Sequence, residues 1–199
     1  LADTPLPATC TTALAPLTAM EASTCTGMRG EFAMRAAHFR AQQANFSKVQ
    51  AGIFFNDEKS SARTAETMAW PCLPDNQMLI ADDRPLPPAP QLSLRRLECA
   101  ANYIGCIMSA IAAPAYDQYA ARQQDVGAQL RLLQAILWLR EHTDRMAGKT
   151  LAQRVQALPP ALRDGPRSIR VGDGGETLEL PAYASNTAGK PLSMPVPKA

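Results

Sequence analysis

Hydrophobic positions follow a helical period through most of this chain, and the first clear case lies between about Thr26 and Ser47. Three phenylalanines there recur once every two helical turns. The apolar residues on this stripe are Met28, Phe32, Ala36, Phe39 and Phe46. This spacing predicts an amphipathic helix that packs through its phenylalanine face.

The most apolar part of the chain predicts two long helices on either side of Pro114. We expect the first to be capped by Ser93 and to end or kink at Pro114. Its predicted buried face consists of Leu97, Ala100, Ala101, Ile104, Ile107, Met108 and Ile111. The second helix runs from about Ala115 to His142 and carries two neighbouring apolar stripes. These stripes are Val126, Leu130, Leu133 and Leu137, and Leu132, Ile136 and Leu139. So wide an apolar face predicts a central helix with neighbours on two sides.

The other helices predicted from the pattern are short. After a Pro-containing leader over residues 1–7, Thr11 or Thr12 caps a helix toward Met20. The stretch 49–90 loses the helical period and contains many prolines, so we expect a long excursion with one short helix near 62–69. Thr150 caps a further short helix that ends before Pro159.

The C-terminal part changes to the two-residue period of β-strands. Residues 168–171 and 176–180 alternate apolar and polar side chains around a Gly-Asp-Gly-Gly turn, which predicts a β-hairpin packed on the helices. Residues 181–199 are rich in Pro, Ala and Ser, and either wrap the helices, add a strand or stay mobile.

The expected fold is therefore mainly α, an irregular bundle of about four to six helices with a C-terminal β-hairpin and an extended Pro-rich tail. We expect one domain over residues 1–180, with the hairpin at about 167–180, and a tail over 181–199.

Composition narrows the class of function. The formal charge is +2, with 20 basic and 18 acidic residues and 6% aromatic residues, so neither net charge nor stacking side chains favour binding to nucleic acid. Arginine outnumbers lysine and alanine is abundant, a bias typical of GC-rich bacterial genomes. No stretch has the length and apolarity of a membrane span. The start at Leu1 indicates a mature or truncated product from which a signal peptide or a membrane anchor has been removed.

The five cysteines are Cys10, Cys25, Cys72, Cys99 and Cys106. None has the close spacing of a zinc site. On one continuous helix Cys99 and Cys106 lie roughly 10 Å apart, too far for a disulfide. We expect Cys72 to bond one of these two and Cys10 to bond Cys25 or the remaining one, which leaves one free thiol and indicates an oxidising compartment such as the periplasm. The alternative is five reduced, buried cysteines in the cytosol.

Short motifs that suggest chemistry have simpler structural explanations. The sequence from Ala147 to Thr150 resembles the end of a phosphate-binding loop, but Thr143 stands where that motif needs glycine. His38 has the spacing of a half-exposed surface histidine. His142 follows Glu141 and precedes Asp144 at a helix end that favours a cation, and no nucleophile motif accompanies it.

Charged pairs offer equally weak candidates. Asp57–Glu58 and Asp82–Asp83 lie in predicted loops, where a carboxylate pair serves glycoside or metal chemistry in some enzymes. Arg95–Arg96 point about 100° apart on a helix and do not converge on one anion.

We therefore assign no catalytic, cofactor-binding or metal-binding residues from the sequence. The leading hypothesis is a non-enzymatic bacterial cell-envelope protein that acts by binding an unidentified protein partner, in an accessory, assembly or inhibitor-like role. The alternative is an envelope hydrolase whose site is assembled from distant segments, with His142 or the carboxylates at 82 and 83. Convergence of these groups in one pocket distinguishes the two.

Overall fold

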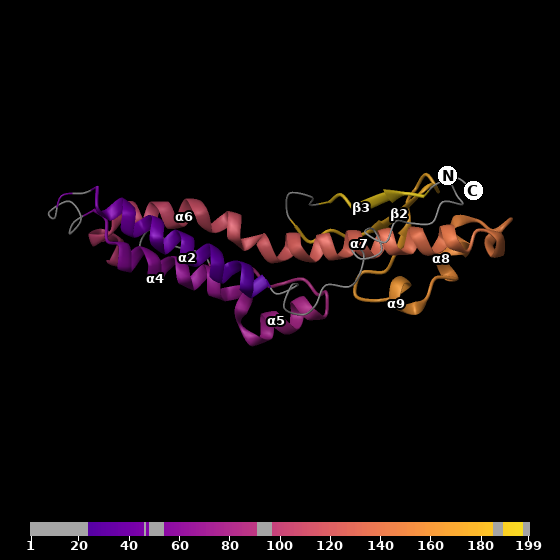
Figure 1. The fold of residues 1–199 in the computed structure, drawn as a ribbon, viewed down its shortest axis with the longest axis horizontal. Helices are drawn as coiled ribbons and strands as arrows, with labels where there is room; N and C mark the ends of the chain where they lie inside the picture. The colour runs from indigo at the N-terminus through magenta and orange to yellow at the C-terminus, as the bar shows by residue number, and fades with distance from the viewer. Residues whose placement is uncertain (1–23, 46, 48–53, 91–96, 185–188, 197–199) are drawn as a thin grey trace. The chain divides into compact units, whose positions relative to one another are not determined.

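The computed structural model describes residues 24–45, 47, 54–90, 97–184 and 189–196 (Figure 1). It is mainly α-helical with a small antiparallel sheet near the C-terminus, which confirms the predicted fold class. The chain clusters into two compact units. Of the described residues, the helical unit holds 24–81 and 86–120, and the mixed unit holds 82–85 and those after 120. The single domain expected over 1–180 stays a prediction.

The first helices of the helical unit are α2 (Thr24–Gln43) and α4 (Asp57–Ala69). Helix α2 matches the predicted amphipathic helix and buries Met28 and Phe39. The Phe39 ring meets the Phe55 ring edge to face, with centroids 6.0 Å apart. Phe46 and the helix expected toward Met20 lie outside the described residues.

The segment between α2 and α6 is more helical than the sequence predicted. Helix α4 begins before residue 62 because the Asn56 side chain accepts a hydrogen bond from the Lys59 backbone N–H, and two acidic residues occupy the first turn. A short 3₁₀ turn η1 (Trp70–Cys72) and helix α5 (Pro74–Ala81) follow. The expectation of one short helix in this stretch is therefore wrong.

The helix predicted to run from a Ser93 cap is interrupted after residue 101, and Ser93 itself lies outside the described residues. Of the two outcomes expected at Pro114, an end of the helix is wrong and a kink stays a prediction. The structure has a 3₁₀ turn η2 (Leu97–Ala101) followed by helix α6 (Tyr103–Asp117), which continues past Pro114. Asn102 separates the two. Its side-chain oxygen accepts a hydrogen bond from the Asn56 backbone N–H at 2.8 Å, so a tertiary contact holds the chain where the periodicity indicated an unbroken helix.

Helix α6 buries a different face from the one that its apolar residues predicted. Cys106, Ser109 and Ala113 are buried, whereas Ile111 is 76% exposed. The reason is the close packing of α6 on α4. A Cβ atom at Gly105 would lie 1.9 Å from Ser60 Oγ, so only the small side chains of α6 fit against α4.

Buried polar groups complete the α4–α6 contact. The Thr64 and Ser109 hydroxyls share a hydrogen bond of 3.2 Å, and the Asn102 amide donates to Ser60 Oγ at 3.0 Å. These bonds satisfy side chains that would be costly to bury alone.

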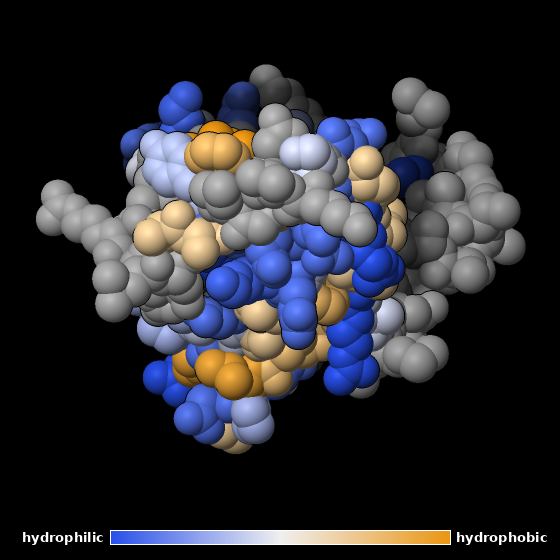
Figure 2. Space-filling model, turned by 90° about the vertical axis from the view of Figure 1, so that its left-hand side faces the viewer, coloured by the Kyte–Doolittle hydropathy of each residue, from blue (hydrophilic) through white to orange (hydrophobic). Residues whose placement is uncertain are grey.

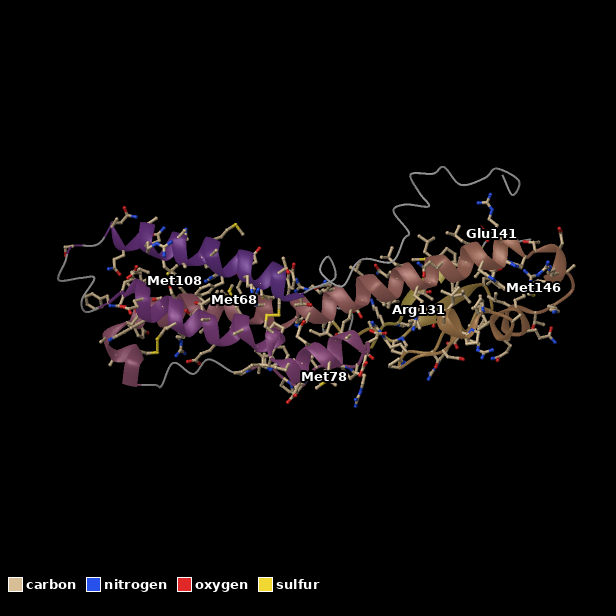
Figure 3. The ribbon with its side chains drawn as sticks, turned by 60° about the horizontal axis from the view of Figure 1, so that its bottom comes forward. Met68, Met78, Met108, Arg131, Glu141 and Met146 are labelled. Carbon is tan, nitrogen blue, oxygen red and sulfur yellow. A yellow bond between two sulfur atoms is a disulfide. The ribbon has the colours of Figure 1, made fainter. Side chains whose placement is uncertain are left out.

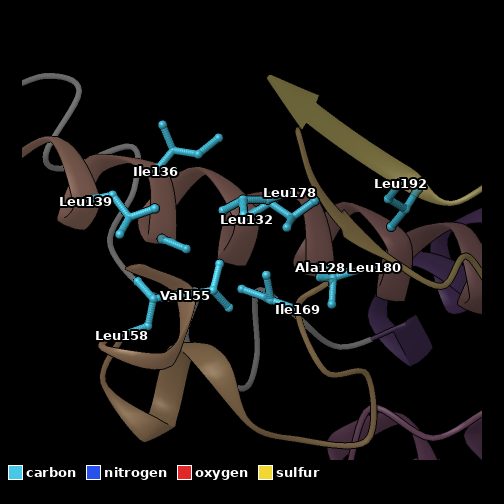
Figure 4. Close-up of a cluster of buried hydrophobic side chains, with 11 residues drawn as sticks. Ala128, Leu132, Ile136, Leu139, Val155, Leu158, Ile169, Leu178, Leu180 and Leu192 are labelled. Carbon is cyan, nitrogen blue, oxygen red and sulfur yellow. The ribbon is translucent and has the colours of Figure 1, made fainter. Parts of the chain in front are cut away.

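The mixed unit is built on helix α7 (Tyr119–Glu141), the second long helix predicted from the sequence. One predicted stripe, Leu132, Ile136 and Leu139, is buried against the C-terminal segments, as Figure 4 shows. The other stripe is half-buried and ends in Val126, which is 53% exposed. The wide apolar face is therefore not buried over its full width.

Short helices follow α7: η3 (Asp144–Met146), α8 (Leu151–Gln156) and α9 (Pro160–Arg163). Thr150 caps α8 as predicted, through a reciprocal pair of hydrogen bonds with Gln153. Helix α9 is a further turn of helix that begins at Pro160, directly after the stretch where the helix capped by Thr150 was expected to end. Proline at the first position of a helix loses no hydrogen bond, which explains this extension.

The sheet contains β1 (Arg170–Val171), β2 (Thr177–Leu180) and β3 (Leu192–Pro195), in that order and antiparallel. Strands β1 and β2 are the predicted hairpin. Strand β3 comes from the Pro-rich tail. Of the three alternatives left open for the tail, its residues 192–195 therefore add a strand. Leu178, Leu180 and Leu192 point into the core with α7 (Figure 4).

Candidate functional site

A buried ion-pair cluster of the mixed unit centres on the side chain of Arg167, which is 1% exposed. This side chain forms ion pairs with Asp83 and with Asp125, the latter at 2.7 Å. Its remaining N–H groups donate to the carbonyl oxygens of Gln124 at 2.8 Å and Pro181 at 3.3 Å. All five guanidinium donors thus have acceptors.

Tyr183 covers this cluster, which we call the Arg167 cluster (Asp83, Asp125, Arg167 and Tyr183). The Arg167 guanidinium lies 4.0 Å from the centre of the Tyr183 ring. The Tyr183 hydroxyl donates to the Asp83 carbonyl at 2.8 Å. The backbone N–H groups of Tyr183 and Ala184 donate to the Asp125 carboxylate at 2.9 and 3.0 Å. The cluster therefore joins residue 83, α7 and the segment after β2.

The ion pairs of Arg167 shift the pKa of its guanidinium. Burial by itself lowers the pKa of the Arg167 guanidinium, but the hydrogen bond and charge of Asp83, followed by the hydrogen bond of Asp125, raise the pKa above its ordinary value. Burial raises the pKa of the Tyr183 hydroxyl. Asp83 has φ 51°, a left-handed conformation that non-glycine residues rarely adopt, and its two bonds to Arg167 hold it there.

Arg131 of α7, labelled in Figure 3, extends the cluster. Its guanidinium donates to the backbone carbonyl of Arg167 and, at 3.5 Å, to that of Asp164. Burial lowers its pKa, and the neighbouring Asp83 charge opposes that effect. The arrangement is a stabilised cation in a filled site, so it anchors chain segments rather than presenting a reactive group to solvent.

Two pairs of cysteines lie at disulfide distance, both in the helical unit (Figure 3). Cys25 pairs with Cys72, and Cys99 pairs with Cys106, with Cα atoms 5.3 and 5.7 Å apart. The predicted bond of Cys72 to Cys99 or Cys106 is wrong, and the partners expected for Cys10 are paired with other cysteines. The helix begins only at Tyr103, so Cys99 lies in η2 and the chain turns back toward Cys106. Cys10 lies outside the described residues.

The other residues considered from the sequence do not gather into one site. His142 stacks on Trp138, with ring centroids 4.1 Å apart, and its Nδ1 lies 2.8 Å from the Trp138 carbonyl. His38 is exposed, as predicted. Asp83 is engaged by Arg167, and Asp82 is exposed. Asp57 and Glu58 form the first turn of α4 rather than a loop. Arg95 and Arg96 lie outside the described residues.

The sequence did not single out Arg167, Asp125 or Tyr183. They come from separate segments, and no spacing or motif joins them. Only Asp83 was noted, as one of two adjacent acidic residues. Its position at the start of a Pro-rich stretch gave no indication of a partner more than eighty positions away.

Apolar side chains reach the surface of the helical unit. Figure 2 shows hydrophobic residues, in orange, beside hydrophilic ones on the face that it presents. On α6, Tyr103 is 57% and Ile111 76% exposed, and Ile107 between them is half-exposed. These three residues follow at intervals of four and form one line along the helix, which we call the α6 ridge.

Within the described ranges, no group of three or more His, Cys, Asp or Glu side chains is arranged to hold a metal ion. No helix in that part of the chain is long and apolar enough to cross a membrane. Comparison of the chain with protein-family models, with curated proteins and with solved structures finds no match.

Proposed function

We propose that this chain is a non-enzymatic bacterial cell-envelope protein that acts by binding another protein through the α6 ridge. The observation that carries the proposal is the exposure of Tyr103 and Ile111 on a helix whose residues 103–116 include no charged side chain. Apolar residues at intervals of four on an accessible helix are the usual anchors in helix-mediated recognition.

Burial of the ridge against a partner contributes to the binding energy. Covering one large aliphatic side chain contributes about 1.5–3 kcal/mol, and the ridge offers two isoleucines and a tyrosine. Tyrosine is enriched among residues that dominate protein interfaces, since it combines a large apolar ring with a hydroxyl.

The cysteine pairs support the proposed location in the cell envelope. Disulfides persist mainly in oxidising environments, so two pairs at disulfide distance are compatible with a periplasmic or other extracytoplasmic protein. One of them, between Cys99 and Cys106, links η2 to the first turn of α6 and so fixes the start of the helix that carries the ridge.

The test places a photo-crosslinking residue at position 107, in the middle of the ridge, in the chain expressed in a bacterial envelope. We expect a discrete crosslinked protein that Ile111→Glu or Tyr103→Glu reduces at least tenfold. Val126→Glu is the matched control, because Val126 is an exposed apolar residue on a helix of the other unit. A product that survives both ridge substitutions, or that Val126→Glu removes equally, contradicts the proposal.

The hydrolase alternative gains no observation in its favour. Asp83 is held by Arg167, and the contacts of His142 are with Trp138. A general base has to reach the group that it deprotonates, and neither residue is joined to a nucleophile by a contact in the described part of the chain.

A further inference from the structure

A cavity of about 430 Å³ lies beside the sheet of the mixed unit, lined by residues of β1 and β2 and by the described residues that follow β2 and precede β3. Its charged lining residues are Arg170 on β1, Glu179 on β2 and Lys190 just before β3. Pro181 and Pro191 form apolar parts of the wall. The volume falls within the range of about 300–1,000 Å³ that is usual for small-molecule sites.

One wall of the cavity is fixed by the Arg167 cluster. The Pro181 carbonyl accepts a hydrogen bond from Arg167, and the backbone N–H groups of Tyr183 and Ala184, just beyond Ala182, donate to the Asp125 carboxylate. The chain leaving β2 is therefore held by buried, charge-assisted bonds. Such support keeps a site open in one geometry and reduces the entropy lost when a ligand binds.

In the part of the chain that the structure describes, the cations of the cavity have no carboxylate partner. Arg170 lies opposite Glu179 in the sheet register. The Glu179 carboxylate, however, accepts hydrogen bonds on Oε1 from the hydroxyls of Thr177 at 3.2 Å and Ser193 at 3.3 Å. Neither Arg170 nor Lys190 has an acidic partner among the described residues.

Gly172 explains why Glu179 turns away from Arg170. A Cβ atom at Gly172 would lie 2.4 Å from Glu179 Oε1 and 2.2 Å from Thr177 Oγ1, so the glycine makes room for this carboxylate at the hairpin end. The arrangement leaves two cations and one tethered carboxylate at the cavity, an excess of positive charge.

We propose that this cavity binds a small anionic molecule through a carboxylate or phosphate group held between Arg170 and Lys190. The guanidinium binds two oxygens of the anion in its plane, and the ammonium supplies a point charge. The uncharged part of the ligand lies against Pro181 and Pro191. The negative charge of Glu179, whose carboxylate is held by Thr177 and Ser193, lowers the affinity of the cavity for the anion. The affinity is therefore below that of a pocket lined by cations alone.

The experiment is an NMR titration of the whole oxidised chain with inorganic phosphate in one arm and glutarate in the other. We expect saturable shifts of the Ala182, Gly189 and Lys190 amide resonances in at least one arm, and the arm that saturates first identifies the preferred oxyanion. Arg170→Gln and Lys190→Gln should each weaken binding roughly tenfold, the effect of one lost charge-assisted hydrogen bond. Glu179→Gln should instead strengthen it several-fold.

Lys149→Gln is the matched control, because Lys149 is an exposed lysine of the same unit outside the cavity. Arg170 and Lys190 are exposed, so their substitution should leave the thermal unfolding midpoint unchanged. Measuring that midpoint shows that each variant is folded. The proposal is overturned if neither probe produces localised shifts up to about 10 mM, if Lys149→Gln weakens binding as much as the cavity variants, or if Glu179→Gln weakens it.

The cavity and the α6 ridge belong to different units, so the two proposals fail separately. Ile111→Glu should leave anion binding unchanged, and Arg170→Gln should leave the crosslink at position 107 unchanged.

Discussion

Arg167 Nη1 donates to Asp125 Oδ1 at 2.7 Å although the two residues are 42 positions apart in the chain. The two side chains are 1% and 8% exposed, so the contact is removed from water. A buried guanidinium is tolerated only when its other donors are also satisfied, and Asp83 and two backbone carbonyls complete the set. This pair therefore determines which segments of the mixed unit meet.

Replacing Arg167 with methionine should destabilise the mixed unit strongly. The substitution keeps an unbranched apolar stem but leaves the Asp83 and Asp125 carboxylates without their cation, a loss of about 3–5 kcal/mol. Urea unfolding followed by circular dichroism gives the free energy. The control is Arg163→Gln, which breaks an exposed pair with Asp164 and should have a much smaller effect. Equal effects of the two substitutions would show that the buried pair is not important for stability.

Two helical glycines should respond to alanine with opposite signs. Gly105→Ala places a methyl group 1.9 Å from Ser60 Oγ and 2.4 Å from Asn102 Oδ1, so α6 has to move away from α4 at a cost of about 1–3 kcal/mol. Gly30→Ala in α2 meets no atom within 4 Å and should stabilise the same unit by about 0.5–1 kcal/mol. Thermal unfolding of both variants tests the close contact of α4 and α6, and a stabilising Gly105→Ala would refute it.

The two cysteine pairs should contribute unequally to stability. Their sequence separations are 47 and 7, and the restriction of the unfolded chain increases with the loop that a disulfide closes. We expect Cys25→Ser with Cys72→Ser to cost about 4 kcal/mol and Cys99→Ser with Cys106→Ser about 2 kcal/mol. Denaturant unfolding measures both. Peptide mapping by mass spectrometry without reduction checks the pairing first, and a Cys72–Cys99 or Cys72–Cys106 peptide would contradict the structure.

Tyr183 should make the stability of the mixed unit sensitive to alkaline pH. Burial raises the pKa of its hydroxyl, so the unfolded chain loses this proton near pH 10, before the folded chain does. The unfolded state is then favoured, and stability falls as pH rises from about 10 toward the folded-state pKa.

Tyr183→Phe removes this titration together with the hydrogen bond to the Asp83 carbonyl, which is worth about 1 kcal/mol at neutral pH. The wild-type advantage over the variant should therefore shrink above about pH 10. Unfolding free energies between pH 8 and 11 measure this, with Tyr103→Phe as an exposed control. A constant difference across that range would show that Tyr183 does not titrate differently on folding.

Strand β3 is an edge strand among the described residues, and this edge should resist pairing with another chain. The Val196 N–H donates to the Glu176 carbonyl, and by the alternation of antiparallel pairing Leu192 and Met194 also direct their backbone groups to β2. Pro191, Ser193 and Pro195 then face outward, and the two prolines offer no N–H.

Replacing Pro191 and Pro195 together with valine should create an edge that self-associates. Light scattering after size-exclusion chromatography should show dimers or larger species, whereas Pro88→Val in an exposed segment of the other unit should leave the mass unchanged. An unchanged mass for the double variant would show that these prolines do not protect the edge.

Local sequence patterns predicted many of the helices and strands, but few of the residues at which they begin and end. The capping box at Thr150 and the hairpin around Gly172 depend on residues a few positions apart, so their side chains predict them directly. The break at Asn102 depends on a hydrogen bond to residue 56, and no local pattern contains it. The buried face of α6 was predicted wrongly because periodicity identifies the most apolar face of a helix, whereas close packing on α4 requires the face with the smallest side chains.

The sequence by itself determined the helical class, the long helix α7 and the C-terminal hairpin. It also showed enough cysteines to form disulfides. Each follows from periodicity, turn residues or composition, which act over one or two turns of the chain. The tertiary structure decided the cysteine pairs, the Arg167 cluster, the exposed ridge on α6 and the cavity beside the sheet. These features depend on which distant segments approach one another. The fit of side-chain volumes and of buried charges decides this, and any single stretch of sequence contains only one of the two partners in each contact.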